Sequence, residues 1–169
     1  MHGPLHRFLC ADHRRLDALL KRALSRPGRI ELSPFGEFRA GILRHIAMEE
    51  KVLLPAARRA LGEPLPIAAR LRVDHGALAA LLVPTPTPVV AVGILSVLVP
   101  HDRREEEPGG VYDACDAALG PAEAERLVEE LRSFPEVPLK PYNDGPEVMA
   151  HLEACLERSR RQWREQDGG

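Results

Sequence analysis

The stretch DHRRLDALL at residues 12–20 returns as DHGALAALL at residues 74–82. Both copies place a histidine among leucines that recur every three or four residues, which is the spacing of one helix face. A His-x-x-x-Glu pair follows each copy downstream: His45 and Glu49 after the first, and His101 and Glu105 after the second. The two halves of the chain therefore repeat one histidine-bearing helical pattern, and we expect a helical fold built on that duplication.

The overall composition limits which partners the protein is expected to bind and in which cell compartment it is expected to lie. A chain of 169 residues is long enough for one domain with a single buried core. Its formal net charge is only -2, so neither a nucleic acid nor an anionic membrane is an expected partner. The three cysteines, Cys10, Cys115 and Cys155, are odd in number and widely spaced, which fits neither a disulfide framework nor a C-x-x-C pair. A reducing cytoplasm is therefore expected.

The apolar runs of the chain do not predict a secretion signal or a membrane anchor. The sequence opens without an apolar run of the signal-peptide type. The most apolar run, Val89 to Val99, is shorter than the about 20 residues that span a bilayer, so it is predicted to be a buried core helix. We expect a soluble monomer or weak homodimer. The sequence does not identify a protein partner.

Helical periodicity covers four segments that are separated by short loops. The first begins at Gly3-Pro4 and ends at Pro27-Gly28; the second begins with Ser33 as N-cap and Pro34 as first helical residue, and continues to about Leu61. The third extends from Ile67 to Leu82, and the fourth from Val89 to the Pro108-Gly109-Gly110 break. Because short loops make successive helices antiparallel neighbours, we predict an all-α fold with an antiparallel four-helix bundle over residues 1–120.

Residues 121–169 are predicted to be a C-terminal helical extension that packs on the bundle within the same domain. A short helix is expected at 111–119, and an amphipathic helix at 121–134. A proline-rich extended segment at 134–142 then leads to a last helix that begins near Pro146 and frays in the charged terminus at 164–169.

Six polar residues occupy apolar positions on the stripes of the four bundle helices: His13, His45, Glu49, His75, His101 and Glu105. A buried carboxylate without a partner costs several kcal/mol, so it usually pairs, shifts its pKa or binds a metal. No lysine or arginine lies on these stripes to neutralise Glu49 or Glu105. We therefore predict that metal cations supply the missing positive charge.

The spacing of the His-x-x-x-Glu pairs suits metal binding. Residues i and i+4 project from one helix face about one turn apart, so both side chains of a pair can reach one metal centre. Imidazole and carboxylate ligands without thiolates suit iron, manganese or zinc. The Glu-x-x-His motif of ferritin-like di-iron proteins is missing. A metal-free bundle with buried, hydrogen-bonded polar residues is the alternative interpretation.

In these motifs the chain resembles the hemerythrin-like (HHE cation-binding) family over roughly residues 4–119. The resemblance implies two iron ions, bridged by an oxo or hydroxo group, that lie between four helices and bind O2 or related small molecules. It also implies the ligand set: His13 and His45 for one iron, His75 and His101 for the other, and Glu49 and Glu105 as bridging carboxylates.

Departures from the oxygen-carrying hemerythrins favour sensing or redox chemistry over reversible O2 transport. Those proteins place a further histidine four positions after the third-helix ligand, where this chain has Ala79. One iron should therefore lack a protein ligand and keep an open or water-filled position. Pro100, which precedes His101, and the Pro108-Gly109-Gly110 break are expected to loosen the geometry.

Three functions remain in contention. The leading hypothesis is a non-haem di-iron protein that acts on a small diatomic ligand or peroxide as a sensor or redox module, rather than as a dedicated enzyme. The second is a peroxidase-like or nitric-oxide-handling enzyme, including the iron–sulfur repair branch of the family. That branch commonly carries an N-terminal segment that contains cysteine, and Cys10 alone is a poor match to it. The third is a metal-poor structural bundle.

Five acidic residues lie next to the predicted ligands or on the same helices. Glu50, Glu106 and Glu107 fall off the apolar stripes and are expected to be solvated, although a rotation of the helix would bring Glu50 or Glu106 near a metal. Asp12 and Asp74 each precede a predicted histidine ligand, and neighbours in sequence point about 100° apart on a helix. They are interpreted either as acceptors that orient other histidines or as surface caps.

Overall fold

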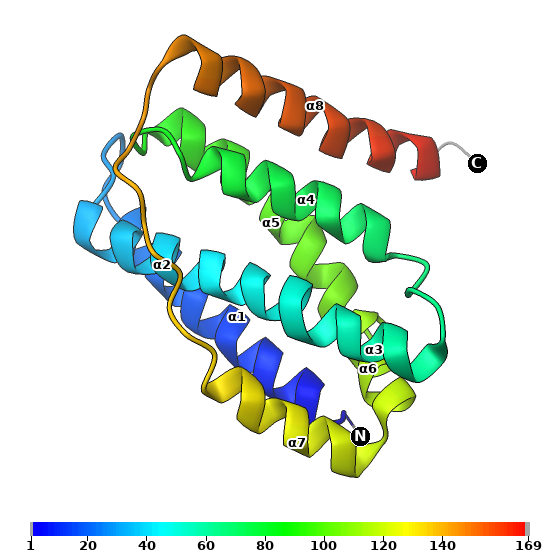
Figure 1. Ribbon diagram of the computed structural model, residues 1–169. Helices are drawn as coiled ribbons and strands as arrows, with labels where there is room; N and C mark the ends of the chain where they lie inside the picture. Colours follow the sequence, from blue (N-terminus) through cyan, green and yellow to red (C-terminus); the bar gives the residue numbers. More distant parts are fainter. Residues whose placement is uncertain (1, 168–169) are drawn as a thin grey trace.

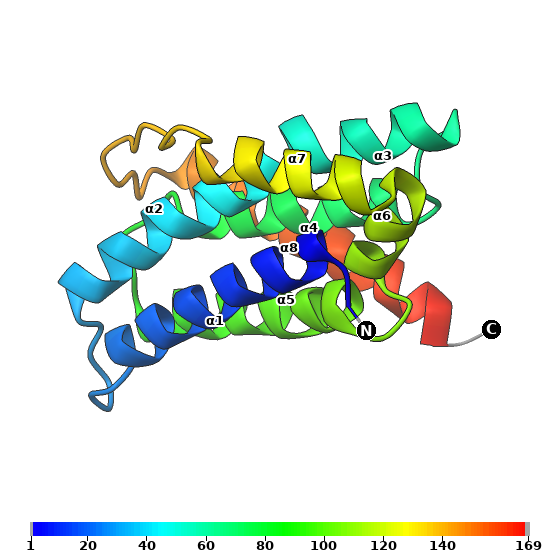
Figure 2. The ribbon, with the colours of Figure 1, turned by 90° about the horizontal axis from the view of Figure 1, so that it is seen from below.

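The computed structural model describes residues 2–167, and over that range it contains helices and loops but no strand (Figures 1 and 2). The all-helical fold class is therefore confirmed. The elements, in chain order, are α1 (Pro4–Ala23), α2 (Leu32–Met48), the π-helical turn η1 (Glu49–Leu53), α3 (Leu54–Leu61), α4 (Ala68–Leu81), α5 (Pro88–Glu106), α6 (Val111–Leu119), α7 (Pro121–Arg132) and α8 (Pro146–Asp167). No break separates α2, η1 and α3, which follow one another as one helical rod.

The start of α2 differs from the prediction. The helix begins at Leu32, its N-cap residue is Glu31, and the side chain of Glu31 makes no capping hydrogen bond. Instead, the carbonyl of Glu31 accepts the N–H of Phe35 at 3.2 Å. Glu31 is itself fixed, because its N–H donates to the carbonyl of Ala23 at 2.9 Å. The preceding loop therefore sets the start of the helix, and the prediction of Ser33 as N-cap is wrong.

Elements after residue 110 pack against the first five helices. In Figure 1, α7 lies near α1 and α8 lies along α4. The guanidinium of Arg44 on α2 donates to the carbonyl oxygens of Leu131, Arg132 and Phe134, and so caps the C-terminal end of α7. The division of the chain into a bundle and an extension remains a prediction.

The segment between α7 and α8 is extended, as the prolines predict. The N–H of Asn143 donates to the carbonyl of Val83 at 3.0 Å, and the hydroxyl of Thr85 donates to Asp144 at 2.7 Å. These contacts hold the segment against the loop before α5. Residues 164–167, where fraying is predicted, are helical in α8, and residues 168–169 lie outside the described part.

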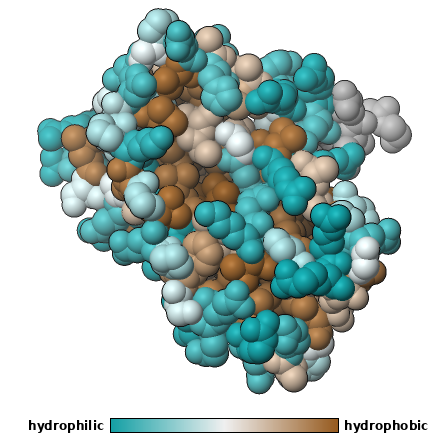
Figure 3. Space-filling model, in the orientation of Figure 1, coloured by the Kyte–Doolittle hydropathy of each residue, from teal (hydrophilic) through white to brown (hydrophobic). Residues whose placement is uncertain are grey.

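The apolar run in α5 is not the fully buried core helix that its composition predicts. Val89, Val92 and Val99 are 81 %, 67 % and 61 % exposed, while Ile94 and Leu98 on the other face are buried. Within the described range no helix is both long and apolar enough to cross a membrane. Figure 3 shows apolar residues interspersed with hydrophilic ones on one face of the molecule.

A layer of polar side chains divides the apolar core into two clusters. Along α1, Leu9 belongs to one cluster and Leu16 to the other, and His13 lies between them. The same change of cluster occurs along α2 and α4: Ile42 and Met48 flank His45, and Leu71 and Leu78 flank His75. The fold therefore brings the predicted ligands of different helices to one level, with apolar packing on both sides.

Candidate metal centre

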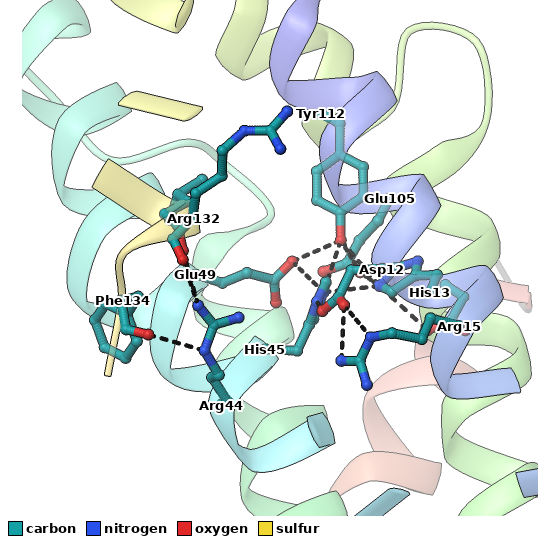
Figure 4. Close-up of polar contacts among 12 residues, drawn as sticks. Asp12, His13, Arg15, Arg44, His45, Glu49, Glu105, Tyr112, Arg132 and Phe134 are labelled. Atoms are coloured by element: carbon teal, nitrogen blue, oxygen red, sulfur yellow. Dashed lines mark hydrogen bonds and ion pairs between the residues drawn. The ribbon is translucent and has the colours of Figure 1, made fainter. Parts of the chain in front are cut away.

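All six predicted ligands meet in this polar layer, and each is at most 5 % exposed. Figure 4 shows four of them: His13, His45, Glu49 and Glu105. Their ligand atoms form two groups of four, and within each group all atoms lie within 4.8 Å of one another. Half-site 1 contains His13 and His45, half-site 2 contains His75 and His101, and both contain Glu49 and Glu105. A cluster of this composition could hold a metal ion.

Glu49 is shared between the half-sites through its two carboxylate oxygens. Its Oε1 lies 3.3 Å from Nε2 of His45 in half-site 1. Its Oε2 lies 3.1 Å from Nε2 of His75 in half-site 2. One carboxylate therefore directs a separate oxygen to each pair of histidines.

Glu105 repeats this arrangement from α5. Its Oε2 lies 3.5 Å from Nε2 of His13, and its Oε1 lies 3.1 Å from Nε2 of His101. Among the side chains that the structure describes, the ion pairs of Glu49 and Glu105 are all to histidines. Each glutamate therefore lies between the two half-sites and directs one oxygen to each, as a bridging carboxylate would.

Several polar atoms that face the centre have no hydrogen-bond partner among the described residues. They include Oε2 of Glu49, Oε1 of Glu105 and Nε2 of His75, all buried. Unpaired buried polar groups cost free energy and are rare in proteins. A cation bound between these atoms would satisfy all three, so the residues present fit a metal ion.

The outer nitrogens of the half-site 1 histidines face carboxylates. Nδ1–H of His45 donates to Oδ2 of Asp12 at 2.9 Å, and Nδ1–H of His13 donates to Oε1 of Glu106 at 2.7 Å. A carboxylate at Nδ1 fixes the tautomer that leaves the lone pair of Nε2 free for a metal. For Asp12, the structure supports the interpretation as an acceptor that orients a histidine. Glu106, which the sequence predicts to be solvated, is partly exposed but also accepts a hydrogen bond from His13.

Half-site 2 is supported in the same way. Nδ1–H of His75 donates to Oε1 of Glu50 at 2.7 Å, and Nδ1 of His101 lies 3.5 Å from Oδ2 of Asp74. Glu50 is also predicted to be solvated; it is partly exposed but accepts a hydrogen bond from His75, whereas Glu107 is exposed as expected. Each supporting carboxylate is the chain neighbour of a predicted ligand on one helix and orients a histidine on another.

The π-helical turn explains how two consecutive glutamates serve one histidine. Glu49 reaches Nε2 of His75 from the first position of η1, and Glu50 reaches Nδ1 of the same ring. The N–H of Leu54 donates to the carbonyl of Glu49, five residues earlier, in place of the usual four. Pro55 follows directly and has no N–H for a regular helical bond, which favours the wider turn.

The two histidines of half-site 1 approach each other closely. Nε2 of His13 lies 2.9 Å from Nε2 of His45, so a proton or a metal ion must lie between the two lone pairs. Without metal, burial alone would lower the pKa of His45, but the charges and hydrogen bonds of Glu49 and Asp12 outweigh it and raise the pKa to about 10. Burial likewise opposes ionisation of Glu49, but His45 and His75 hold its pKa well below the usual range.

One residue of the centre is missing from the sequence prediction. Tyr112, on α6, is fully buried, and its hydroxyl points into half-site 1 (Figure 4). Burial, followed by the charges of Glu105 and Glu49, raises the pKa of Tyr112 well above its usual range. The residue lies beyond the Pro108-Gly109-Gly110 break and off the four helical stripes, so only the turn between α5 and α6 brings it to the site.

No protein-family model, curated protein or solved structure matches this chain. Function is therefore inferred from the two half-sites themselves. They offer imidazole nitrogens and carboxylate oxygens, and no thiolate, because burial raises the pKa of Cys10 and Cys115 to about 12. Such a donor set suits borderline or hard divalent and trivalent cations.

Proposed function

We propose that this chain is a non-haem di-iron protein of the hemerythrin-like type, with the four ligand-bearing helical segments as its bundle. It acts on O2 or a related small ligand as a sensor or redox module. The observation that carries this proposal is the division of Glu49 and Glu105 between two histidine pairs. One metal ion would use only one oxygen of each carboxylate, whereas two ions use all four.

Coordination argues against a structural zinc site, and the family resemblance favours iron over manganese. Structural zinc prefers four ligands in a closed tetrahedron, whereas this centre shares its two carboxylates between two adjacent cation positions. Imidazole and carboxylate donors suit iron and manganese equally well in type. The resemblance of the His and His-x-x-x-Glu pattern to hemerythrin-like proteins then favours iron.

The side chains around the centre perform the tasks that a redox site requires of its protein. Bound iron would supply electrons to a small oxidant. The carboxylates of Asp12, Glu50, Asp74 and Glu106 orient the histidine rings. The apolar clusters on both sides exclude bulk water from the polar layer. Small neutral molecules can enter such a layer more easily than ions.

Half-site 2 is the proposed position for the exogenous ligand. Its metal would be held by His75, His101 and one oxygen from each glutamate. Ala79 follows His75 by one helical turn and offers no donor atom. An octahedral ion at half-site 2 therefore keeps a position for O2, peroxide or nitric oxide.

An anaerobic spectrum tests this proposal. The protein is loaded with iron(II), and its absorption is recorded before and after O2, and then with azide. We expect rapid oxidation, a spectrum typical of oxo-bridged iron(III) and a further change on azide binding. A protein that binds iron but does not react with O2 would overturn the proposed chemistry, and sustained peroxide consumption would identify the enzymatic alternative.

A further inference from the structure

The hydroxyl of Tyr112 is surrounded by the metal-facing atoms of half-site 1. It donates to Oε1 of Glu49 at 2.6 Å and lies 3.0 Å from Oε2 of Glu105. It also lies 3.0 Å from Nε2 of His13 and 3.2 Å from Nε2 of His45. All four neighbours are proposed ligand atoms, and each is the atom directed at half-site 1.

These distances match the edges of one coordination shell. Two donor atoms that bind one metal at about 2.0–2.2 Å and at right angles lie about 3 Å apart. The Nε2 atoms of His13 and His45 are 2.9 Å apart, and the Tyr112 oxygen has the same separation from each neighbour within a few tenths of an ångström. The Tyr112 oxygen therefore lies at a fifth corner of one coordination polyhedron, whose other four corners are the two histidine nitrogens and the two glutamate oxygens.

We propose that Tyr112 is a metal ligand of half-site 1 through its phenolate oxygen. This inference rests on the proposed di-iron function. On binding, the O–H bond of the phenol breaks, a metal–oxygen bond forms and the proton leaves to solvent, as for other protein ligands that bind deprotonated. The phenolate adds a third negative charge to those of Glu49 and Glu105, which favours iron(III) over iron(II) in this half-site.

The fold holds Tyr112 in place without help from a metal. Asp113, its neighbour, accepts the N–H of Gly109 at 3.0 Å and so fixes the turn into α6. One turn further, Asp116 accepts the N–H groups of Leu5 and His6 at 3.0 Å and ties α6 to the start of α1. The ring is thus positioned by two capping carboxylates on its own helix.

This ligand gives the two half-sites different roles. Half-site 1 has five protein donors, and a bridging oxygen would complete six-fold coordination. Half-site 2 has four, so the exchangeable position lies there, beside Ala79. The small ligand therefore binds at the ion of His75 and His101.

Phenolate coordination has a spectroscopic signature that is independent of any turnover. Iron(III) bound to phenolate gives a visible charge-transfer band, and excitation in that band enhances tyrosine ring vibrations in the resonance Raman spectrum. The chain contains two tyrosines, so Tyr142→Phe, on the exposed segment before α8, is a matched control for Tyr112→Phe. Metal content, far-UV circular dichroism and both spectra are measured on the oxidised wild-type protein and the two variants.

We expect the band and the ring vibrations in the wild type and in Tyr142→Phe, and their complete loss in Tyr112→Phe at unchanged iron content. A wild-type protein with two irons and no such band would overturn the assignment of Tyr112 and leave the proposed function intact. Absence of iron in the wild type would instead overturn the proposed function. If Tyr112→Phe fails to fold, the vibrations in Tyr142→Phe still decide, because Tyr112 is then the only tyrosine.

Discussion

At the scale of single residues, the centre is built from pairs in which one carboxylate orients one imidazole. Glu50 illustrates the pattern, because its Oε1 accepts Nδ1–H of His75 while Oε2 accepts the guanidinium of Arg72 at 3.1 Å. The carboxylate is thereby held in place from the solvent side. The histidine ring is fixed from outside before any metal reaches its inner nitrogen.

Loss of this support should weaken metal binding without unfolding the protein. Glu50→Gln keeps the shape of the side chain but removes its charge, and we expect metal affinity to fall by about 10- to 100-fold. Asp17→Asn, on the exposed face of α1, is the control, because Asp17 pairs only with Lys21 among the contacts described. Competition with a chelator measures both variants. Unchanged affinity in Glu50→Gln would show that His75 needs no such support.

Ala79→His should fill the exchangeable position proposed for half-site 2. Ala79 is partly buried and lies one turn beyond His75, so Ala79→His can direct its ring at the same ion. We expect slower oxidation of the reduced protein in air and weaker azide binding. Stopped-flow absorption compares it with Ala79→Leu, which adds bulk without a donor. Equal rates for the histidine variant and the wild type would place the exchangeable position elsewhere.

The sequence predicts the residues that depend on helical periodicity and misses those that depend on the turns between helices. His13 and Glu49 are recognisable because a polar residue interrupts an apolar stripe. Glu50 lies off the stripe of its own helix, and its role becomes visible only when α4 packs nearby. Tyr112 reaches the centre because the chain reverses after Gly110, and periodicity does not specify the direction of that reversal.

At the scale of elements, α8 is connected to the centre through Asp74. Oδ1 of this fully buried residue accepts the hydroxyl of Ser159 at 2.7 Å and the side-chain amide of Gln162 at 2.9 Å. Its Oδ2 faces Nδ1 of His101. The C-terminal helix therefore completes the support of a half-site 2 histidine, which gives it a role beyond covering α4.

Removal of the Ser159 hydroxyl should destabilise the protein measurably. Hydrogen bonds to charged groups contribute about 1.5–3 kcal/mol, and Ser159→Ala leaves Asp74 with one donor fewer from α8. We expect the free energy of unfolding to fall within that range in urea denaturation. Ser133→Ala, at the exposed end of α7, should change it by less than about 0.5 kcal/mol. Equal effects in both variants would contradict the proposed connection through Asp74.

At the scale of the whole molecule, the polar layer makes stability depend on pH and on metal. In the metal-free protein the pKa of His45 is raised from 6.5 to about 10, so folding favours its protonated form. That stabilisation is complete below about pH 6.5 and is lost as the pH rises towards 10. The lowered pKa of Glu49 acts in the opposite direction, so its contribution is present above pH 4.5 and is lost in acid.

The melting temperature of the metal-free protein should therefore decrease between pH 7 and pH 10. Bound metal requires neutral histidines, so the metal-loaded protein should lose this dependence and be more stable at every pH in the range. Thermal denaturation followed by circular dichroism measures both forms. His151→Gln, at an exposed position on α8, is the control and should leave the slope unchanged. A metal-free protein whose stability is constant over this range would contradict the buried His–Glu network.

Metal content tests whether two ions share Glu49 and Glu105. Protein expressed in iron-replete medium is analysed for all transition metals, together with Glu49→Ala and, as a control, Glu107→Ala, whose side chain is exposed. Two irons per chain are predicted for the wild type and for Glu107→Ala, and one or none for Glu49→Ala. A wild-type protein with no metal or with zinc alone, or a Glu49→Ala variant that retains both irons, would contradict a di-iron centre bridged by Glu49 and Glu105.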